Sequence, residues 1–141
     1  MKIAVGSDHG GFELKELIVR FLGELGQEVE SVGCYSPDSV DYPDFAEKVC
    51  TAVRMGTCDC GILVCGTGIG MSIAANRHKE IRAALCHEAF TARMSREHNN
   101  SNVLCLGGRV IGSEIALDIV RTWVGTEFEG GRHLRRLEML S

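Results

Sequence analysis

The sequence lacks both a long run of apolar residues and a surplus of basic side chains. None of its apolar segments approaches the roughly 20 residues that a helix needs to span a bilayer. Lysine and arginine number 15 against 19 aspartate and glutamate residues, which gives a formal net charge of −4. A nucleic-acid-binding protein usually carries the opposite imbalance. We therefore expect neither a membrane nor a nucleic acid as a partner of this chain.

A secretory signal is also missing from the N-terminal residues MKIAVGSDHGG, which reach serine, aspartate and glycine too soon for an apolar signal core. We therefore expect a cytoplasmic protein. Apolar side chains make up 45% of the 141 residues, 24% are charged, and no segment is of low complexity. This composition predicts one compact domain over residues 1–141.

The chain also lacks the cysteine pattern of a disulfide-bonded or zinc-binding protein. Its cysteines are Cys34, Cys50, Cys58, Cys60, Cys65, Cys86 and Cys105. An odd number without an export signal does not indicate a disulfide framework, and several lie in apolar runs, as buried cysteines do. The sequence Cys58-Asp59-Cys60 has no second half of a zinc site and no C-x-x-C spacing for dithiol exchange. We therefore expect no zinc site at these cysteines, and keep a redox role for Cys58, Cys60 and Cys65 only as a third alternative.

Strand-like and helix-like segments alternate along the whole chain. Strands are predicted at residues 2–7, 28–32, 61–65, 81–86 and 103–106. Helices are predicted at residues 14–25, from Asp41-Tyr42-Pro43 to near Gly56, and at residues 71–76, 88–97, 113–124 and about 132–140. Five successive strand–helix units predict an α/β fold of three α/β/α layers, a Rossmann-like domain whose five-stranded parallel sheet carries helices on both faces. The order of the strands stays open.

Two details of burial follow from these patterns. The helix at 113–124 is expected to bury five side chains, which are Ile115, Ala116, Ile119, Val120 and Trp123. Cys86 and Cys105 are expected to lie within their strands as ordinary core residues.

Groups capable of chemistry follow the predicted strands. Asp8 and His9 follow the first strand, the segment from Cys65 to Gly70 follows the third, and Arg109 follows the fifth. His98 and Asn99 follow the helix at 88–97. Because ligands of parallel sheets bind at the carboxyl ends of the strands, we expect most of these groups to converge on one crevice.

The segment VCGTGIG, residues 64–70, combines a thiol with three alternating glycines. Backbone amides at the start of a helix attract an anion, either a phosphate or an oxyanion formed in a reaction. The segment is neither a Walker A motif nor a G-x-G-x-x-G fingerprint, and a purely structural tight turn fits it about as well. A thiol just before a helix can have its pKa lowered from about 8.5 toward neutrality, which favours Cys65 as a base or nucleophile over an ordinary core cysteine.

Each of the other candidates also has a structural interpretation. Asp8 could cap the first helix, His9 could be a turn residue, and His98 could contact the last carbonyls of its helix. Arg132 and Arg136 are four residues apart and share a helix face, which suits a phosphate dianion but also a solvated basic face.

Taken together, these motifs resemble the type B ribose-5-phosphate isomerases of the ribose/galactose isomerase family. The motifs are GSDHGG, DYPDFA, CGTGIGMSIAAN, SREHNNSNVLCLGGRV and EGGRHLRRL, and they run in register from Ile3 to about Leu137. The resemblance implies a metal-free and cofactor-free aldose–ketose isomerase of the pentose phosphate pathway. Such enzymes interconvert ribose 5-phosphate and ribulose 5-phosphate through a cis-enediolate, as homodimers or tetramers of dimers with shared active sites.

The resemblance also implies a role for Cys65. One branch of the family has a glutamate base directly after the last loop glycine and no cysteine at the strand end. This chain has Met71 at that position and Cys65 at the strand end, so it is similar to the cysteine-base branch. Cys65 is then the base that moves a proton between C2 and C1, and Thr67 helps to move one between O1 and O2.

The remaining roles are likewise implied by the resemblance. His98, assisted by Asp8, opens the sugar ring. The implied substrate-binding residues are His9, Tyr42, Gly66, Gly68, Ile69, Gly70, Asn99, Arg109, Arg132 and Arg136. Among them His9, Arg132 and Arg136 hold the phosphate with support from Arg109, and Tyr42 and Asn99 contact hydroxyls. The resemblance allows His98 and Asn99 to come from the neighbouring subunit.

Two other functions stay open. One is the same reaction on a six-carbon substrate such as allose 6-phosphate or galactose 6-phosphate. The other is a nucleotide-binding module, with Glu88 about where a ribose-binding acid would lie, although the G-x-G-x-x-G spacing is absent.

Overall fold

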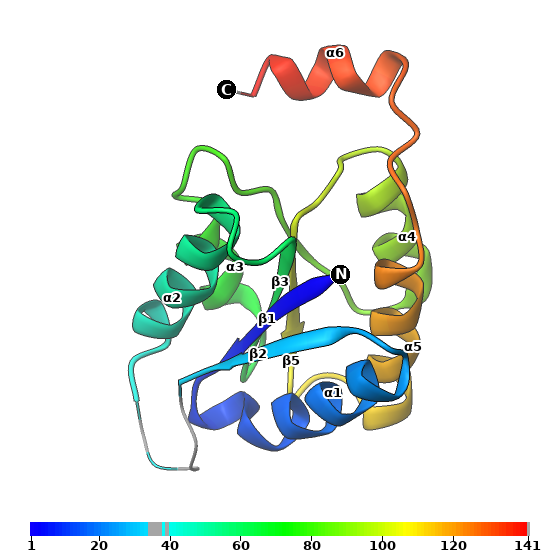
Figure 1. Cartoon of the computed structure of the whole chain (residues 1–141). Coiled ribbons are helices and arrows are strands. Elements are labelled where there is room, and N and C mark those ends of the chain that lie inside the picture. Colours follow the sequence, from blue (N-terminus) through cyan, green and yellow to red (C-terminus); the bar gives the residue numbers. More distant parts are fainter. Residues whose placement is uncertain (34–37, 39, 141) are drawn as a thin grey trace.

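The computed structural model describes residues 1–33, 38 and 40–140, so Cys34 lies outside the described residues. Strands and helices alternate as the sequence predicts (Figure 1). The strands are β1 (Lys2–Ser7), β2 (Glu28–Val32), β3 (Cys60–Cys65), β4 (Ala83–Leu85) and β5 (Val103–Gly107). The helices are a short 3₁₀ turn η1 (His9–Gly11), α1 (Phe12–Glu24), α2 (Tyr42–Arg54), α3 (Ile69–Ala75), α4 (Ala89–Glu97), α5 (Ser113–Val124) and α6 (Arg132–Glu138). Within the described ranges, no helix combines the length and the apolarity needed to cross a membrane.

The five strands form one parallel sheet in the order β2-β1-β3-β5-β4. The predicted α/β fold is confirmed. Strand β3 is the central strand, and it pairs with β1 on one side and β5 on the other. The segments that follow these three strands therefore lie side by side. All six residues of β3 are buried, as expected for an apolar strand covered on both faces.

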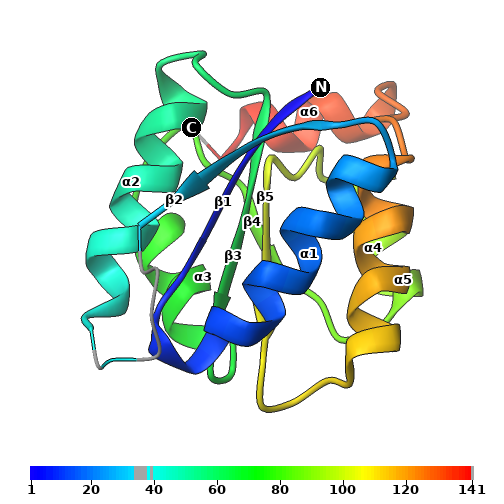
Figure 2. The same cartoon turned by 60° about the horizontal axis from the view of Figure 1, so that its bottom comes forward.

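Helices cover both faces of the sheet, which gives the three predicted layers (Figure 2). On one face, α1, α4 and α5 pack against the side chains of Ile3, Ile62 and Leu104. On the other face, α2 and α3 pack against Ala4 and Leu63. Successive strand residues point to opposite faces, so a single apolar strand supplies both cores.

The predicted helix at 71–76 and the predicted strand at 81–86 differ from the structure in their bounds. Helix α3 begins at Ile69, two residues earlier than predicted, because Gly68 takes a left-handed turn that starts the helix at once. Strand β4 is shorter than predicted and ends at Leu85, so Cys86 lies just beyond it. Just before the strand, the amide of Arg82 donates to the Asn102 carboxamide oxygen at 2.8 Å, and the amide of Asn102 donates to the Arg82 carbonyl oxygen at 3.0 Å.

The expected burial of Ile115 is wrong, because this side chain is 52% exposed. Ala116, Ile119, Val120 and Trp123 are buried, as expected. Ile115 lies in the first turn of α5, where residues 113–115 are all exposed, so periodicity alone assigns it the wrong environment.

Candidate active site

Cys65 is the last residue of β3, at the carboxyl edge of the sheet. Its side chain is 5% exposed, and its sulfur accepts a hydrogen bond from the amide of Gly68 at 3.1 Å. Gly68 has φ +79°, a conformation that side chains other than glycine rarely adopt. A Cβ atom at this position would also lie 2.6 Å from Leu85 Cδ1 and 2.9 Å from the carbonyl carbon of Leu106. Glycine is therefore required for the turn that directs an amide at the sulfur.

The amides of the loop from Gly66 to Gly70 divide into two groups. The amide of Ile69 donates to Thr67 Oγ1 at 3.2 Å, and the amide of Gly68 donates to the sulfur. No acceptor among the described residues takes a hydrogen bond from the amide of Gly66 or of Gly70. These two amides are thus available to an oxygen of a ligand.

Two further candidates flank this loop. A Cβ atom at Gly66 would lie 3.3 Å from Arg109 Nη1, and one at Gly70 would lie 2.8 Å from the Tyr42 ring. The guanidinium and the phenol therefore lie against the two ends of the loop, as expected for groups that bind one ligand together with it.

Asp8 and His9 follow β1, the strand next to β3. Asp8 is 8% exposed, and its Oδ1 accepts hydrogen bonds from the amides of Gly10 at 2.9 Å and Gly11 at 3.2 Å. The capping interpretation of Asp8 is therefore confirmed, although it caps η1 rather than α1 itself. His9 Nδ1 accepts from the amide of Val40 at 3.2 Å, which orients its ring.

The segments after β1, β3 and β5 touch one another. A Cβ atom at Gly10 would lie 3.2 Å from the amide nitrogen of Gly66, and one at Gly108 would lie 2.9 Å from the carbonyl oxygen of Gly10. The expected convergence thus holds for Asp8, the loop that follows Cys65, and Arg109.

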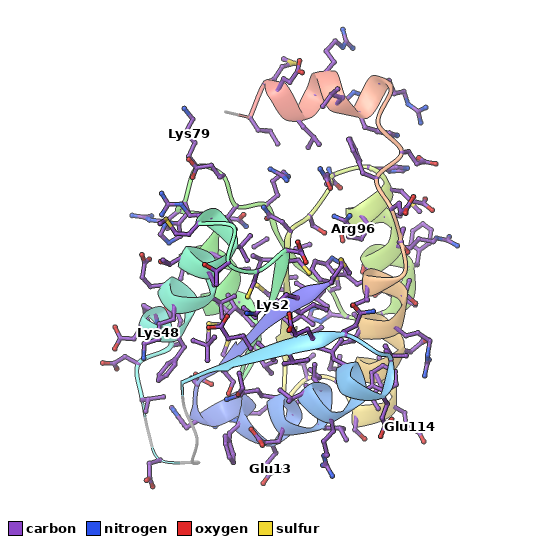
Figure 3. The ribbon with its side chains drawn as sticks, viewed as in Figure 1. Lys2, Glu13, Lys48, Lys79, Arg96 and Glu114 are labelled. Carbon is purple, nitrogen blue, oxygen red and sulfur yellow. The ribbon has the colours of Figure 1, made fainter. Side chains whose placement is uncertain are left out.

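The expected convergence fails for His98 and Asn99. Helix α4 runs antiparallel to the strands, so its C-terminal end lies at the amino edge of the sheet. Figure 3 shows this arrangement, with Glu13 and Glu114 at the carboxyl edge and Arg96, in the last turn of α4, near the opposite edge. The prediction that these groups meet Cys65 in one crevice is therefore wrong for a single chain.

Arg132 and Arg136 also lie far from Cys65 within the chain. They belong to α6, which extends beyond the amino ends of the strands (Figures 1 and 2). Both arginines are exposed, and neither forms an ion pair with any described residue. Helix α6 also leaves Leu134, Met139 and Leu140 exposed. The exposed surface of α6 is therefore both basic and apolar.

Two residues that the sequence reasoning did not single out surround His98. The His98 ring is 38% exposed and stacks on the ring of His133, with centroids 4.2 Å apart. Glu129 Oε1 lies 3.7 Å from Nε2 of His98 and 3.6 Å from Nε2 of His133. Burial lowers the pKa of His133, and the neighbouring His98 lowers it further. Glu129 precedes α6, so helical spacing in the sequence does not indicate its contact with His133.

Similarity to known proteins decides the family. A sequence model described as Ribose/Galactose Isomerase matches residues 3–140. The chain belongs to the ribose/galactose isomerase family. It is 51% identical over 140 residues to ribose-5-phosphate isomerase B of Escherichia coli (strain K12), which covers 99% of this chain and 94% of that protein. It is 41% identical to D-erythrulose-4-phosphate isomerase of Pectobacterium atrosepticum, over 99% of this chain and 93% of the relative.

Solved structures of this family agree. Ribose-5-phosphate isomerase B of Clostridium thermocellum is 56% identical and superposes with a TM-score of 0.98, over 99% of this chain and 95% of that one. The corresponding protein of Thermotoga maritima is 55% identical with a TM-score of 0.97, over 99% and 96% of the two chains.

Several other cysteines have thiols whose pKa values are raised by burial. Burial raises the pKa of Cys50 to about 11 and that of Cys60 to about 12, and it raises the pKa of Cys86 and Cys105 as well. The Cys58 thiol donates to Glu30 Oε2 at 3.2 Å, and burial together with this carboxylate raises its pKa to about 11. These thiols are protonated at neutral pH, which argues against a redox role for Cys58 and Cys60.

Glu88 also has a structural role. Its carboxylate accepts from the amide of Thr91 at 3.0 Å and caps α4. This contact explains the residue without a bound nucleotide.

Proposed function

We propose that this chain is an aldose–ketose isomerase that interconverts ribose 5-phosphate and ribulose 5-phosphate through a cis-enediolate. The observation that carries the proposal is the sulfur of Cys65, held at the end of β3 beside two amides that have no acceptor among the described residues. Relatives that carry this activity in their names cover nearly the whole chain at about half identity, which supports the substrate class.

In the proposed reaction, the Cys65 thiolate removes the proton from C2 of the open-chain aldose. The electron pair moves into the C1–C2 bond, and the carbonyl oxygen becomes an enediolate oxygen. The amides of Gly66 and Gly70 donate to this oxygen, a type of contact whose loss typically raises a reaction barrier by about 3 kcal/mol. Thr67 moves a proton between O1 and O2, and the protonated thiol then returns its proton to C1. The reaction therefore needs one base and one set of donors, both placed on the same turn.

The remaining steps require a second subunit. The sugar in solution is mostly a closed ring, and His98 is the proposed acid–base group that opens it. Within one chain His98, Asn99, Arg132 and Arg136 lie at the other end of the sheet from Cys65. We therefore place these four in the active site of the partner subunit, in a homodimer or a tetramer of dimers. His9, Tyr42 and Arg109 serve the active site of their own chain, and Asp8 holds η1 and assists at the sugar ring.

Substrate length is tested by comparing kcat/KM for ribose 5-phosphate, allose 6-phosphate, galactose 6-phosphate and D-erythrulose 4-phosphate. The last belongs in the comparison because a relative 41% identical is named for it. We expect the highest kcat/KM with ribose 5-phosphate. A higher value with a six-carbon or four-carbon substrate would overturn the pentose assignment but leave the chemistry intact.

The proposal also places the enzyme in the cytoplasm, in carbohydrate metabolism. A nucleotide-binding module is the alternative of another class, and nothing in the geometry favours it. A thermal-shift measurement with NAD and ATP tests it, since a bound nucleotide raises the melting temperature.

A further inference from the structure

We propose that His98, Glu129 and His133 form a binding site for a divalent transition-metal ion such as Zn²⁺. Their three ligand atoms all lie within 4.8 Å of one another. Glu129 Oε1 is the shared centre, 3.7 Å from His98 Nε2 and 3.6 Å from His133 Nε2. Zinc binds imidazole nitrogen and carboxylate oxygen at about 2.0–2.2 Å, so tetrahedral ligands sit about 3.3 Å apart. The three atoms lie somewhat farther apart than this, so the side chains must shift and rotate to surround one ion.

The second observation is an unpartnered nitrogen. His133 is 6% exposed, and its Nε2 has no hydrogen-bond partner among the described residues, yet it points toward Glu129. Buried polar atoms are nearly always paired in native proteins, so an orphan atom of this kind requires an explanation. A metal ion in the space between these side chains would give the nitrogen its partner.

The backbone holds the three residues in place. The amide of Glu129 donates to the carbonyl oxygen of Glu97 at 3.0 Å, which ties the segment before α6 to the end of α4. The amide of His98 donates to Met94, and the amide of His133 donates to Gly130. The two rings are nearly parallel, with an angle of 16° between them, so they must splay for their lone pairs to converge. His98 is partly exposed and can make this rotation.

The surroundings restrict which ions can bind. Arg132 and Arg136 lie near enough to act electrostatically on His133, and their positive charges oppose any dication. An ion must therefore gain enough from two imidazoles and one carboxylate to overcome this repulsion. Zn²⁺, Co²⁺ and Ni²⁺ favour imidazole, whereas Mg²⁺ and Ca²⁺ favour oxygen ligands. The site should select the first group, with water or an anion as a fourth ligand.

Metal binding has a consequence that rests on the proposed function. Coordination occupies Nε2 of His98, the residue proposed to open the sugar ring. Zn²⁺ should therefore inhibit the isomerase, more strongly with the closed sugar than with an open one. The binding itself does not depend on that function.

The test uses the full-length protein after chelator treatment and without any sugar phosphate. Zn²⁺ binding is measured by titration calorimetry, and Co²⁺ serves as a probe through its visible absorption. We expect one ion per chain. Glu129→Gln is the first variant because Glu129 is exposed and its replacement does not disturb the core. His133→Gln is the second, with its fold checked by circular dichroism.

Each variant should weaken binding by more than the roughly 10–100-fold that outer-shell partners contribute to metal affinity. Glu127→Gln and His87→Asn are the matched controls, because they change the same residue types at exposed positions outside the cluster. Both should bind the ion as the unaltered protein does.

No binding at all, or binding unchanged in both Glu129→Gln and His133→Gln, would overturn the proposal. Loss of binding in Cys65→Ala but not in Glu129→Gln would place the metal on the thiol and would overturn it too. If Zn²⁺ binds as expected but ribose 5-phosphate is not turned over, only the proposed function fails.

Discussion

The sulfur of Cys65 and the amide nitrogen of Gly68 lie 3.1 Å apart, with the N–H directed at the sulfur. This hydrogen bond keeps the sulfur turned toward the loop. The same turn presents the amides of Gly66 and Gly70. The proposed base and the amides proposed to stabilise the developing anion thus lie within the six residues from Cys65 to Gly70.

Cys65→Ala should abolish isomerisation while sugar-phosphate binding remains measurable, because the change removes the proposed base and leaves the loop amides in place. The check is kcat, together with calorimetric binding of ribose 5-phosphate. Cys58→Ser is the matched control and should retain activity, since a serine hydroxyl can still donate to Glu30. Near-normal turnover by Cys65→Ala would remove the base assignment.

Gly68→Ala should lose both stability and activity. At φ +79° an alanine costs about 1–2 kcal/mol, and here its Cβ also collides with Leu106. Gly26→Ala is the control, because Gly26 has φ +78° but nothing within 4 Å of its added Cβ. Urea unfolding should show a larger loss of unfolding free energy for Gly68→Ala than for Gly26→Ala, and only the former should lower kcat. Equal losses would mean that the close packing at Gly68 is unimportant.

His98→Asn should impair turnover of closed ribose 5-phosphate far more than proton exchange on an already open sugar phosphate. General acid–base catalysis typically contributes about 10²–10⁴-fold, which sets the scale of the difference. The measurement compares kcat with the rate of deuterium exchange from solvent. His87→Asn, a change at an exposed histidine, should alter neither rate. If His98→Asn reduces both rates equally, His98 has no specific role in ring opening.

Mixing two inactive variants should restore activity if the active site is shared. In a dimer of Cys65→Ala and Arg136→Ala chains, one site combines both changes and the other has neither. Random exchange of subunits makes half of the dimers mixed, so activity should recover to about one quarter of the unaltered value. The assay uses subsaturating ribose 5-phosphate after subunit exchange. Absence of recovery, with mixed dimers shown by mass spectrometry, would place Cys65 and Arg136 outside a common site.

Ser101→Ala should destabilise the fold by about 1–3 kcal/mol, since it leaves a buried donor without its acceptor. Trp123 Nε1 donates to Ser101 Oγ at 2.9 Å, and Ser95 Oγ lies 2.9 Å from the same oxygen. The free energy of unfolding in urea measures the effect. Ser113→Ala, at an exposed position in α5, should change it by less than about 0.5 kcal/mol. A Ser101→Ala protein as stable as the original would show that the network contributes nothing net.

Much of the fold could be predicted because each element has a local signature. The glycine after α1 and the proline at the start of α2 mark helix ends, and the apolar run of β3 indicates a strand covered on both faces. Ile115 shows the limit of such patterns. Periodicity indicates which residues share a helix face. It does not indicate which turns of the helix are covered by other elements.

The residues of the candidate site likewise fall into those that the sequence pattern could place and those that it could not. Cys65, Asp8 and Arg109 were found because the carboxyl ends of neighbouring parallel strands must meet. His98 and Arg136 could be recognised as chemically suitable, but their placement depends on the direction of α4 and α6. Glu129 and His133 were missed because their contact with His98 joins three separate segments of the chain.

Cys65 is the last residue of a strand that is paired on both sides and buried along its whole length. The strand that carries the proposed catalytic loop is therefore anchored to both of its neighbours, and loss of this anchor requires disruption of the sheet. Heat should inactivate this protein by cooperative melting of the whole domain, so its working temperature is set by the stability of the central sheet.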